Sequence, residues 1–250
     1  MAFLTDPDPR FLLARPDLAE QALEGLIPAA LYRATRPKRC RIGFAPITND
    51  AGEPVGEILF GEAFDLLDES DGRGWGRARR DGTVGHVDMD LLEPLGSLPV
   101  ARVATTQASV PLNSLAAEGD GIEPEECADF RVFDTDLAAA AERLLGAPYR
   151  SRGRSRAGVD CGGLVQQALL ACGQPGPRWS DLQARLGRET PFLGRGDLIV
   201  WVGFHAGIAT DPEHLIHACP DHQCVRVDSV ADCDARWRTA GASAPVLRRL

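Results

Sequence analysis

The stretch that most constrains the fold of this chain is an apolar helix followed by four short strands. Apolar side chains at positions 164, 165, 168, 169 and 172 repeat with the spacing of one helix face, Asp160 can cap the start, and Gly173 can end it. Strands are predicted for residues 197–202, 204–210, 214–219 and 224–227. A helical layer followed by an antiparallel meander predicts an α+β domain.

The residues before this domain follow other patterns. Five short apolar runs separated by glycine-rich turns predict a small all-β barrel. An N-terminal arm is expected to contain one helix that starts at Pro16, and a helix after Asp134 opens the α+β domain. The expected boundaries are 1–35 for the helical arm, 36–96 for the barrel, 97–134 for a linker or reduced second barrel, and 135–250 for the α+β domain.

Charge and hydropathy exclude several classes of protein. The chain has 27 basic and 36 acidic residues and a net charge of −9, so a nucleic-acid partner is not expected. No apolar run is long enough to span a membrane, and the first residues do not resemble a secretory signal. Seven cysteines without a disulfide-framework spacing favour free thiols in the cytoplasm. The sequence leaves the oligomeric state open.

Cys161 falls in the first turn of the predicted helix. Unpaired backbone N–H groups and the helix dipole favour a thiolate there, so we expect a reactive cysteine with a lowered pKa. A nucleophilic thiol needs a base, for which histidine is the usual residue. The chain offers His86, His205, His214, His217 and His222.

Two of these histidines lie on neighbouring predicted strands. The turn Asp211-Pro212-Glu213 joins the strands, and a hairpin centred on residue 211 would pair positions whose numbers sum to 422. His205 and His217 would then stand directly opposite each other, with Cβ atoms about 4.5–5.5 Å apart. This predicts Cys161 as nucleophile, His205 as base, and His217, or another polar side chain, as the group that orients the base.

Four ordered motifs resemble those of the NlpC-type cell-wall cysteine peptidases. They are Asp160-Cys161-Gly162-Gly163-Leu164-Val165, Gly196-Asp197-Leu198-Ile199, His205-Ala206-Gly207-Ile208 and Leu215-Ile216-His217-Ala218. The resemblance implies a papain-like fold, with helices packed on an antiparallel sheet, and cleavage between γ-D-glutamate and a diamino acid in peptidoglycan stem peptides. Residues 61–87 similarly resemble a bacterial SH3-like domain.

The resemblance also implies substrate-binding residues. Asp160 matches a position that helps to hold the substrate's N-terminal amine, and Ser180 lies in a run similar to the family's Arg-x-Ser-x-x-Gln element. Tyr149 matches a tyrosine before the nucleophile, whereas Gly162 stands where the family usually has a serine. Ser151 and Arg152 depart from the family's Trp and Gly in the same region.

Two other clusters have alternative interpretations. Arg150, Arg152, Arg154 and Arg156 form either a solvated loop or an anion contact. His217, Cys219, His222 and Cys224 suggest zinc, but their spacing fits no ligand pattern, so neither a metal nor a cofactor is expected.

The leading hypothesis is a cytoplasmic cysteine peptidase that hydrolyses murein peptides such as L-Ala-γ-D-Glu-diaminopimelate during cell-wall recycling. Because Gly162, Ser151 and Arg152 depart from the family, a wall-fragment binding protein without turnover is an alternative. A third reading is a thiol-dependent amidase or acyltransferase that acts on another substrate.

Overall fold

The computed structural model describes residues 7–250, which divide into two compact units. The first contains residues 7–101 and 114–122, and the second contains residues 102–113 and 123–250. Among the described residues, no helix combines the length and apolar character needed to cross a membrane.

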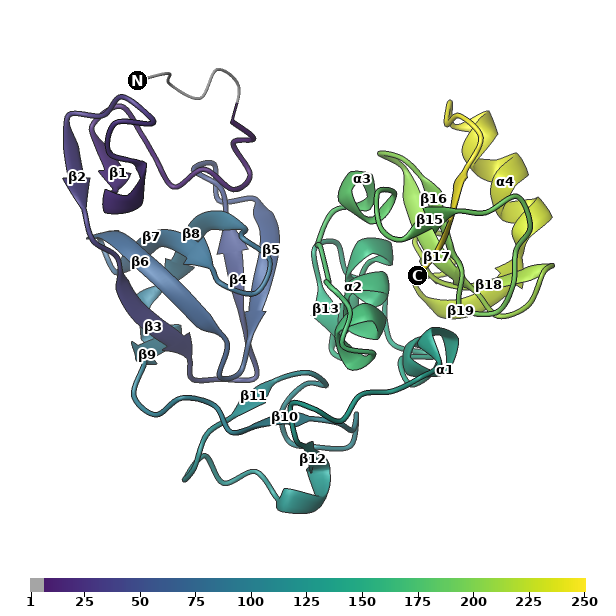
Figure 1. Ribbon diagram of the computed structural model, residues 1–250, viewed down its shortest axis with the longest axis horizontal. Coiled ribbons are helices and arrows are strands. Elements are labelled where there is room, and N and C mark those ends of the chain that lie inside the picture. The colour runs from purple at the N-terminus through teal and green to yellow at the C-terminus, as the bar shows by residue number, and fades with distance from the viewer. Residues whose placement is uncertain (1–6) are drawn as a thin grey trace. The chain divides into compact units, whose positions relative to one another are not determined.

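A seven-stranded antiparallel sheet forms the body of the first unit (Figure 1). Its strand order is β5-β4-β8-β7-β6-β3-β9, and Ile47, Ile58, Phe64 and Leu66 lie in its core. This all-β unit agrees with the predicted SH3-like barrel. The strands are β3 (Arg36–Cys40), β4 (Phe44–Thr48), β5 (Pro54–Leu59), β6 (Ala63–Ser70), β7 (Arg73–Ala78), β8 (Val84–Asp88) and β9 (Leu92–Pro94), with the 3-10 turn η2 (Met89–Leu91) before the last.

The helix expected in the N-terminal arm was wrong. The arm forms β1 (Leu18–Glu20), the 3-10 turn η1 (Gln21–Leu23) and β2 (Leu31–Arg33), and the two strands pair in parallel. Leu18 is buried against Leu67 and Trp75 of the barrel, so tertiary packing overrides the helix-like spacing. The part of this prediction that concerns residues 1–6 lies outside the described residues.

The segment expected as a linker or reduced second barrel is instead divided between the two units. Residues 114–122 belong to the first, where Asp120 receives two hydrogen bonds from Arg39 at 3.0 and 2.8 Å. Residues 102–113 belong to the second, where Asn113 donates to the backbone oxygen of Gln167 at 2.9 Å. The short elements here are β10 (Ala101–Val103), β11 (Leu115–Ala116), η3 (Pro124–Glu126) and β12 (Cys127–Ala128).

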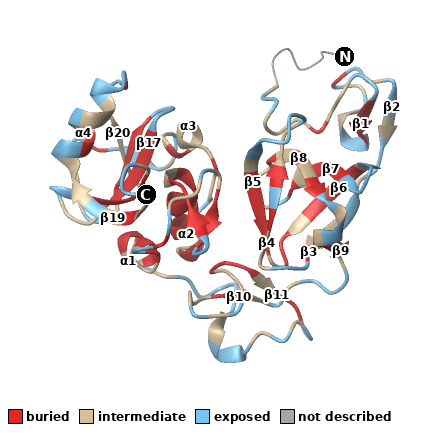
Figure 2. Ribbon diagram, turned by 180° about the vertical axis from the view of Figure 1, so that it is seen from behind, coloured by how far each residue is buried: buried red, intermediate tan, exposed pale blue. Residues whose placement is uncertain are grey.

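The second unit is built on a six-stranded sheet of order β15-β20-β16-β17-β18-β19. Helices α1 (Leu137–Glu142) and α2 (Cys161–Ala171) pack on one face and α4 (Val230–Thr239) on the other (Figure 1). Buried residues concentrate in α2 and the central strands (Figure 2). The strands are β15 (Arg188–Glu189), β16 (Leu198–Trp201), β17 (His205–Ala209), β18 (His214–Cys219), β19 (Cys224–Ser229) and β20 (Val246–Arg249).

This α+β arrangement confirms the predicted fold class, and the sequence patterns missed two of its elements. Helix α4 has only Cys233 fully buried, so it carries no apolar stripe that a pattern search would find. Strand β20 is half-buried along its whole length and joins the sheet next to β16. The remaining elements are β13 (Arg154–Ser155), β14 (Gly158–Val159) and α3 (Ser180–Gln183).

Candidate active site

Cys161 is the first residue of α2, as predicted. Asp160 caps the helix, because its Oδ1 accepts a hydrogen bond from Gly163 N at 2.8 Å. The backbone N–H groups of Gly162 and Ala206 hydrogen-bond the Cys161 sulfur. Since Ala206 belongs to β17, this contact places the thiol beside the strand that begins with His205.

The two predicted histidines form a relay that ends on a carboxylate. His205 Nε2 lies 2.6 Å from His217 Nδ1, and His217 Nε2 lies 2.9 Å from Asp228 Oδ2. A carboxylate accepts hydrogen bonds, so His217 carries its proton on Nε2 and its Nδ1 accepts from His205 Nε2–H. The remaining nitrogen of His205, Nδ1, is therefore unprotonated and can receive a proton.

The predicted hairpin register was wrong by two residues. Ile208 pairs with Ile216 and Ala209 with Leu215, so paired numbers sum to 424 rather than 422. The bend is centred on residue 212, because Thr210 N donates to His214 O. His205 and His217 are consequently diagonal neighbours on one face, a separation that ring side chains can still bridge.

Sequence reasoning missed two partners of these histidines. The Trp237 ring of α4 stacks on His205, with ring centroids 4.6 Å apart and planes 21° from parallel. Asp228 of β19 completes the relay. The alternation of polar residues Arg226 and Asp228 along that strand was a usable signal for Asp228, whereas nothing local to Trp237 indicated its contact.

The pKa of Cys161 is raised to about 11, contrary to the lowered value expected from its place in the helix. Burial of the sulfur is the main cause and the Asp160 charge adds to it, while the Ala206 N–H and the Arg178 charge act in the opposite direction. Burial also holds the pKa of His205 well below 6.5, helped by the neighbouring His217. The resting pair is therefore a neutral thiol and a neutral imidazole.

This protonation state predicts how Cys161 responds to pH. We expect its alkylation by iodoacetamide to be slower at pH 7 than that of the same residue in the urea-unfolded chain, because only a thiolate reacts. The rate should rise about tenfold per pH unit until the pH approaches the pKa. Mass spectrometry of the labelled peptides measures this rate for each thiol, and a plateau near pH 6 would contradict it.

Asp160 is already occupied within the protein. Its Oδ2 accepts hydrogen bonds from Arg178 Nη2 at 2.8 Å and from Arg152 N at 2.9 Å, and its Oδ1 caps α2. Both members of the ion pair are buried, with side chains 9% and 2% exposed for Asp160 and Arg178. In this structure Asp160 supports the start of α2, and its predicted role as the holder of a substrate amine stays a prediction.

Gly162 lies where Arg178 leaves no room for a side chain. A Cβ added there would fall 2.7 Å from Arg178 O and 2.9 Å from Arg178 Nη1. The carbonyl of Gly162 accepts a hydrogen bond from Gln183 Nε2 at 2.9 Å. The glycine that replaces the family's serine is thus matched to the arginine packed against it.

The other two predicted substrate-binding residues lie on different elements. Tyr149 is partly buried, and its pKa is raised by burial and by the charges of Cys161 and Asp160, which places its ring near the nucleophile. Ser180 begins α3, directly after Arg178 and Trp179. No hydrogen bond joins Ser180 to the three proposed catalytic residues among residues 7–250.

Two groups of side chains have the composition of a metal site. The ligand atoms of His217, Asp228 and Cys233 lie within 4.8 Å of one another, and so do those of Cys219, His222 and Asp228. Asp228 is shared by both groups, and its oxygens already bind His217 and Arg226. An ion would have to break these contacts, so the groups fit a relay better than a metal. Cys224, the fourth residue of the weighed zinc set, belongs to neither group.

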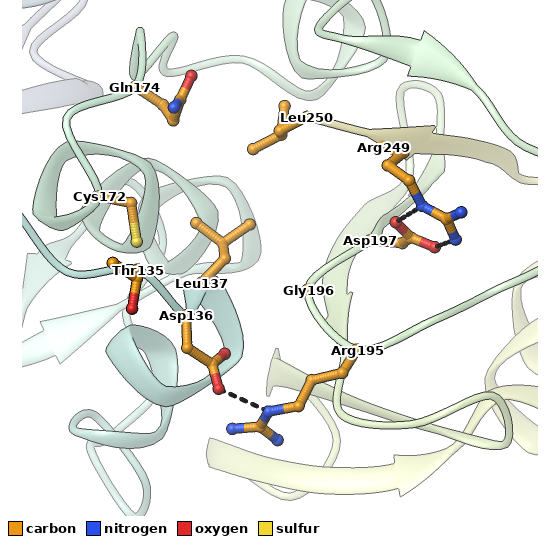
Figure 3. Close-up of a pocket in the computed structure, with 10 residues that line it drawn as sticks. All are labelled: Thr135, Asp136, Leu137, Cys172, Gln174, Arg195, Gly196, Asp197, Arg249 and Leu250. Carbon is orange, nitrogen blue, oxygen red and sulfur yellow. Dashed lines mark hydrogen bonds and ion pairs between the residues drawn. The ribbon is translucent and has the colours of Figure 1, made fainter.

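A separate cavity of about 510 Å³ lies at the other end of α2 (Figure 3). Arg195 pairs with Asp136 and Arg249 with Asp197 on its wall (Figure 3). Cys172 lines it and Cys161 does not, so this cavity is not the site of the proposed nucleophile.

Two family comparisons match parts of the chain. Residues 146–241 match the NlpC/P60 family, and residues 49–92 match the bacterial dipeptidyl-peptidase Sh3 domain. The first range contains all of the residues of the thiol and histidine relay. No curated protein matches the chain.

Solved structures show the same fold. An NlpC/P60 family protein from Bacillus cereus is 15% identical, covers 85% of this chain and 99% of its own, and superimposes with a TM-score of 0.71. NlpC1 from Trichomonas vaginalis is 17% identical over 87% of this chain and 94% of its own, with a TM-score of 0.45. The peptidoglycan hydrolase RipB from Mycobacterium tuberculosis is 27% identical over 45% of this chain and 62% of its own, with a TM-score of 0.37.

Proposed function

We propose, from the NlpC/P60 domain that this chain carries at residues 146–241 behind an SH3-like domain, that the protein is a cysteine peptidase. Its substrates are murein-derived peptides, and the bond cleaved joins γ-D-glutamate to a diamino acid. The observation that carries the proposal is the relay from His205 through His217 to Asp228, beside a thiol at the start of α2.

The protonation states support a general-base mechanism. When the Cys161 sulfur attacks the γ-glutamyl carbonyl, the thiol proton moves to His205 Nδ1. The S–C bond forms, and the oxyanion is met by a backbone N–H of the α2 start, for which that of Cys161 is the candidate donor. His205 then gives its proton to the departing amine as the C–N bond breaks.

Hydrolysis of the thioester reverses the same proton transfers. His205 Nδ1 takes a proton from water as the water oxygen attacks the carbonyl, and returns it to the sulfur when the S–C bond breaks. His217 stays neutral throughout, with Nε2–H bound to Asp228 and Nδ1 accepting from His205. The relay therefore holds one tautomer and one ring orientation of the base.

The substrate assignment is tested with a pair of tripeptides. We expect the protein to release diaminopimelate from L-Ala-γ-D-Glu-meso-diaminopimelate, measured by chromatography and mass spectrometry. The matched control is the same tripeptide with an α-glutamyl linkage, which should remain intact. If the γ-linked peptide also remains intact, this function is wrong.

A binding protein without turnover is the second candidate, and the raised pKa of Cys161 favours it. Calorimetry with the γ-linked tripeptide separates the candidates, since a binding protein would give saturable heat without product. Release of a different product from other amides, after a screen of acyl donors, would instead support a thiol-dependent amidase or acyltransferase.

We place the activity in the cytoplasm, in the recycling of wall peptides. All seven cysteines are free in the structure, and a reducing compartment keeps thiols in that state. Fractionation of cells that produce the native chain tests this placement, and recovery in the extracellular medium would overturn it.

A further inference from the structure

Arg152 occupies an unusual backbone position close to the nucleophile. Its φ is +64°, in the left-handed region that glycine adopts far more readily than a residue with a long side chain. Its backbone N–H donates to Asp160 Oδ2 at 2.9 Å, which fixes the residue beside the start of α2. Such positions persist where the surrounding structure enforces them, and they gather at ligand-binding sites.

The guanidinium of Arg152 is held by an aromatic ring and by no carboxylate. It lies 4.6 Å from the ring centroid of Trp179, and no acidic side chain among residues 7–250 forms an ion pair with it. The residue is partly exposed. Arg152 therefore offers a positioned positive charge whose counter-ion is not supplied by the described part of the chain.

The charge lies within reach of the reacting group. Tyr149 is the link, because its pKa responds to the charges of both Arg152 and Cys161. Of the charged groups that act on Tyr149, Arg152 and Arg178 are positive, and Asp160 is negative and already paired with Arg178. The charged side chains around the tyrosine thus favour an anion over an ammonium group.

The proposed substrate has an anion in the corresponding place. A γ-linked glutamate keeps a free α-carboxylate on the residue that carries the scissile carbonyl. The family's serine after the nucleophile is replaced by Gly162, so no hydroxyl at that position can bind the carboxylate. An arginine is well suited to this contact, because its planar donors bind a carboxylate bidentately.

We propose that Arg152 is a specificity-determining residue that binds the free α-carboxylate beside the scissile bond. This inference rests on the proposed function. Trp179 positions the guanidinium, and the Arg152 N–H to Asp160 contact fixes its backbone. The substrate class is narrowed to glutamyl peptides with an ionised α-carboxylate, as opposed to the α-carboxamide form that occurs when this group is amidated.

The test compares two substrates and three variants. We expect the unmodified protein to cleave L-Ala-γ-D-Glu-meso-diaminopimelate with a kcat/KM about ten- to a hundredfold above that of its α-carboxamide analogue. Arg152→Gly should reduce the ratio to near one by lowering only the carboxylate rate, and Arg152→Lys should restore part of it. Arg156→Gly, in the same loop and exposed, should leave the ratio unchanged.

Misfolding does not obscure the result, because glycine fits a positive φ and Arg152→Gly should keep its melting temperature. A ratio that Arg152→Gly leaves unchanged overturns the inference. If the unmodified protein cleaves neither peptide, the proposed function fails. Recognition is then decided by calorimetry in a Cys161→Ala background, where Arg152→Gly should weaken binding of L-Ala-γ-D-Glu and not of its carboxamide. Equal loss for both ligands contradicts the inference.

Discussion

Replacing Cys161 with alanine is expected to lower kcat/KM for the γ-linked tripeptide by about four orders of magnitude or more. The reason is that no other group can form the acyl intermediate at the position where Ala206 N–H meets the sulfur. Loss of the base should be comparable, so His205→Ala should fall in the same range, since residues that act as one unit give non-additive losses.

Cys172→Ala is the matched control for this experiment. Cys172 follows the same helix, is partly buried and lies at the opposite end of α2 from the proposed nucleophile. Its variant should keep its activity, measured with the same diaminopimelate-release assay. If Cys161→Ala retains more than a few per cent of the activity while remaining folded by circular dichroism, the nucleophile has been assigned to the wrong residue.

Arg178→Gln is expected to be the most destabilising single substitution near the site, by about 3–5 kcal/mol in the free energy of unfolding. It leaves the Asp160 carboxylate buried without its cation, since the two side chains are only 2% and 9% exposed. Because Asp160 also caps α2, we expect activity to fall together with stability. Urea unfolding followed by fluorescence measures the change.

Two further variants isolate the charge effect. Asp160→Asn combined with Arg178→Gln removes both charges, and it should recover part of the stability, because a buried pair costs desolvation that two neutral groups avoid. Arg131→Gln breaks an exposed pair with Asp129, in which the side chains are 89% and 50% exposed, and should change stability by less than about 1 kcal/mol. A double variant no more stable than Arg178→Gln would show that packing, and not charge, holds this corner.

Much of the second unit follows from local pattern. The apolar spacing of residues 164–172 and the cap at Asp160 predicted α2 with its first residue correctly, and the strands β16 to β19 lie where alternation placed them. Helix α4 was missed because its contribution to the core is a few side chains, Cys233 among them, and not an apolar face.

The sequence by itself determined the helix that presents Cys161, the two strands that carry His205 and His217, and the face that these histidines share. These features depend on capping, periodicity and alternation, which act between residues close in the chain. They survive even the register error, because a shift of two residues keeps every side chain on its face.

Only the tertiary structure decided the chemistry of the site. The direction of the relay required Asp228, and the neutral state of Cys161 follows from burial that outweighs the favourable helix terminus. The pairing of Asp160 with Arg178 joins residues 18 positions apart. Desolvation and ion pairing depend on which distant residues surround a group, and the folded chain alone fixes those neighbours.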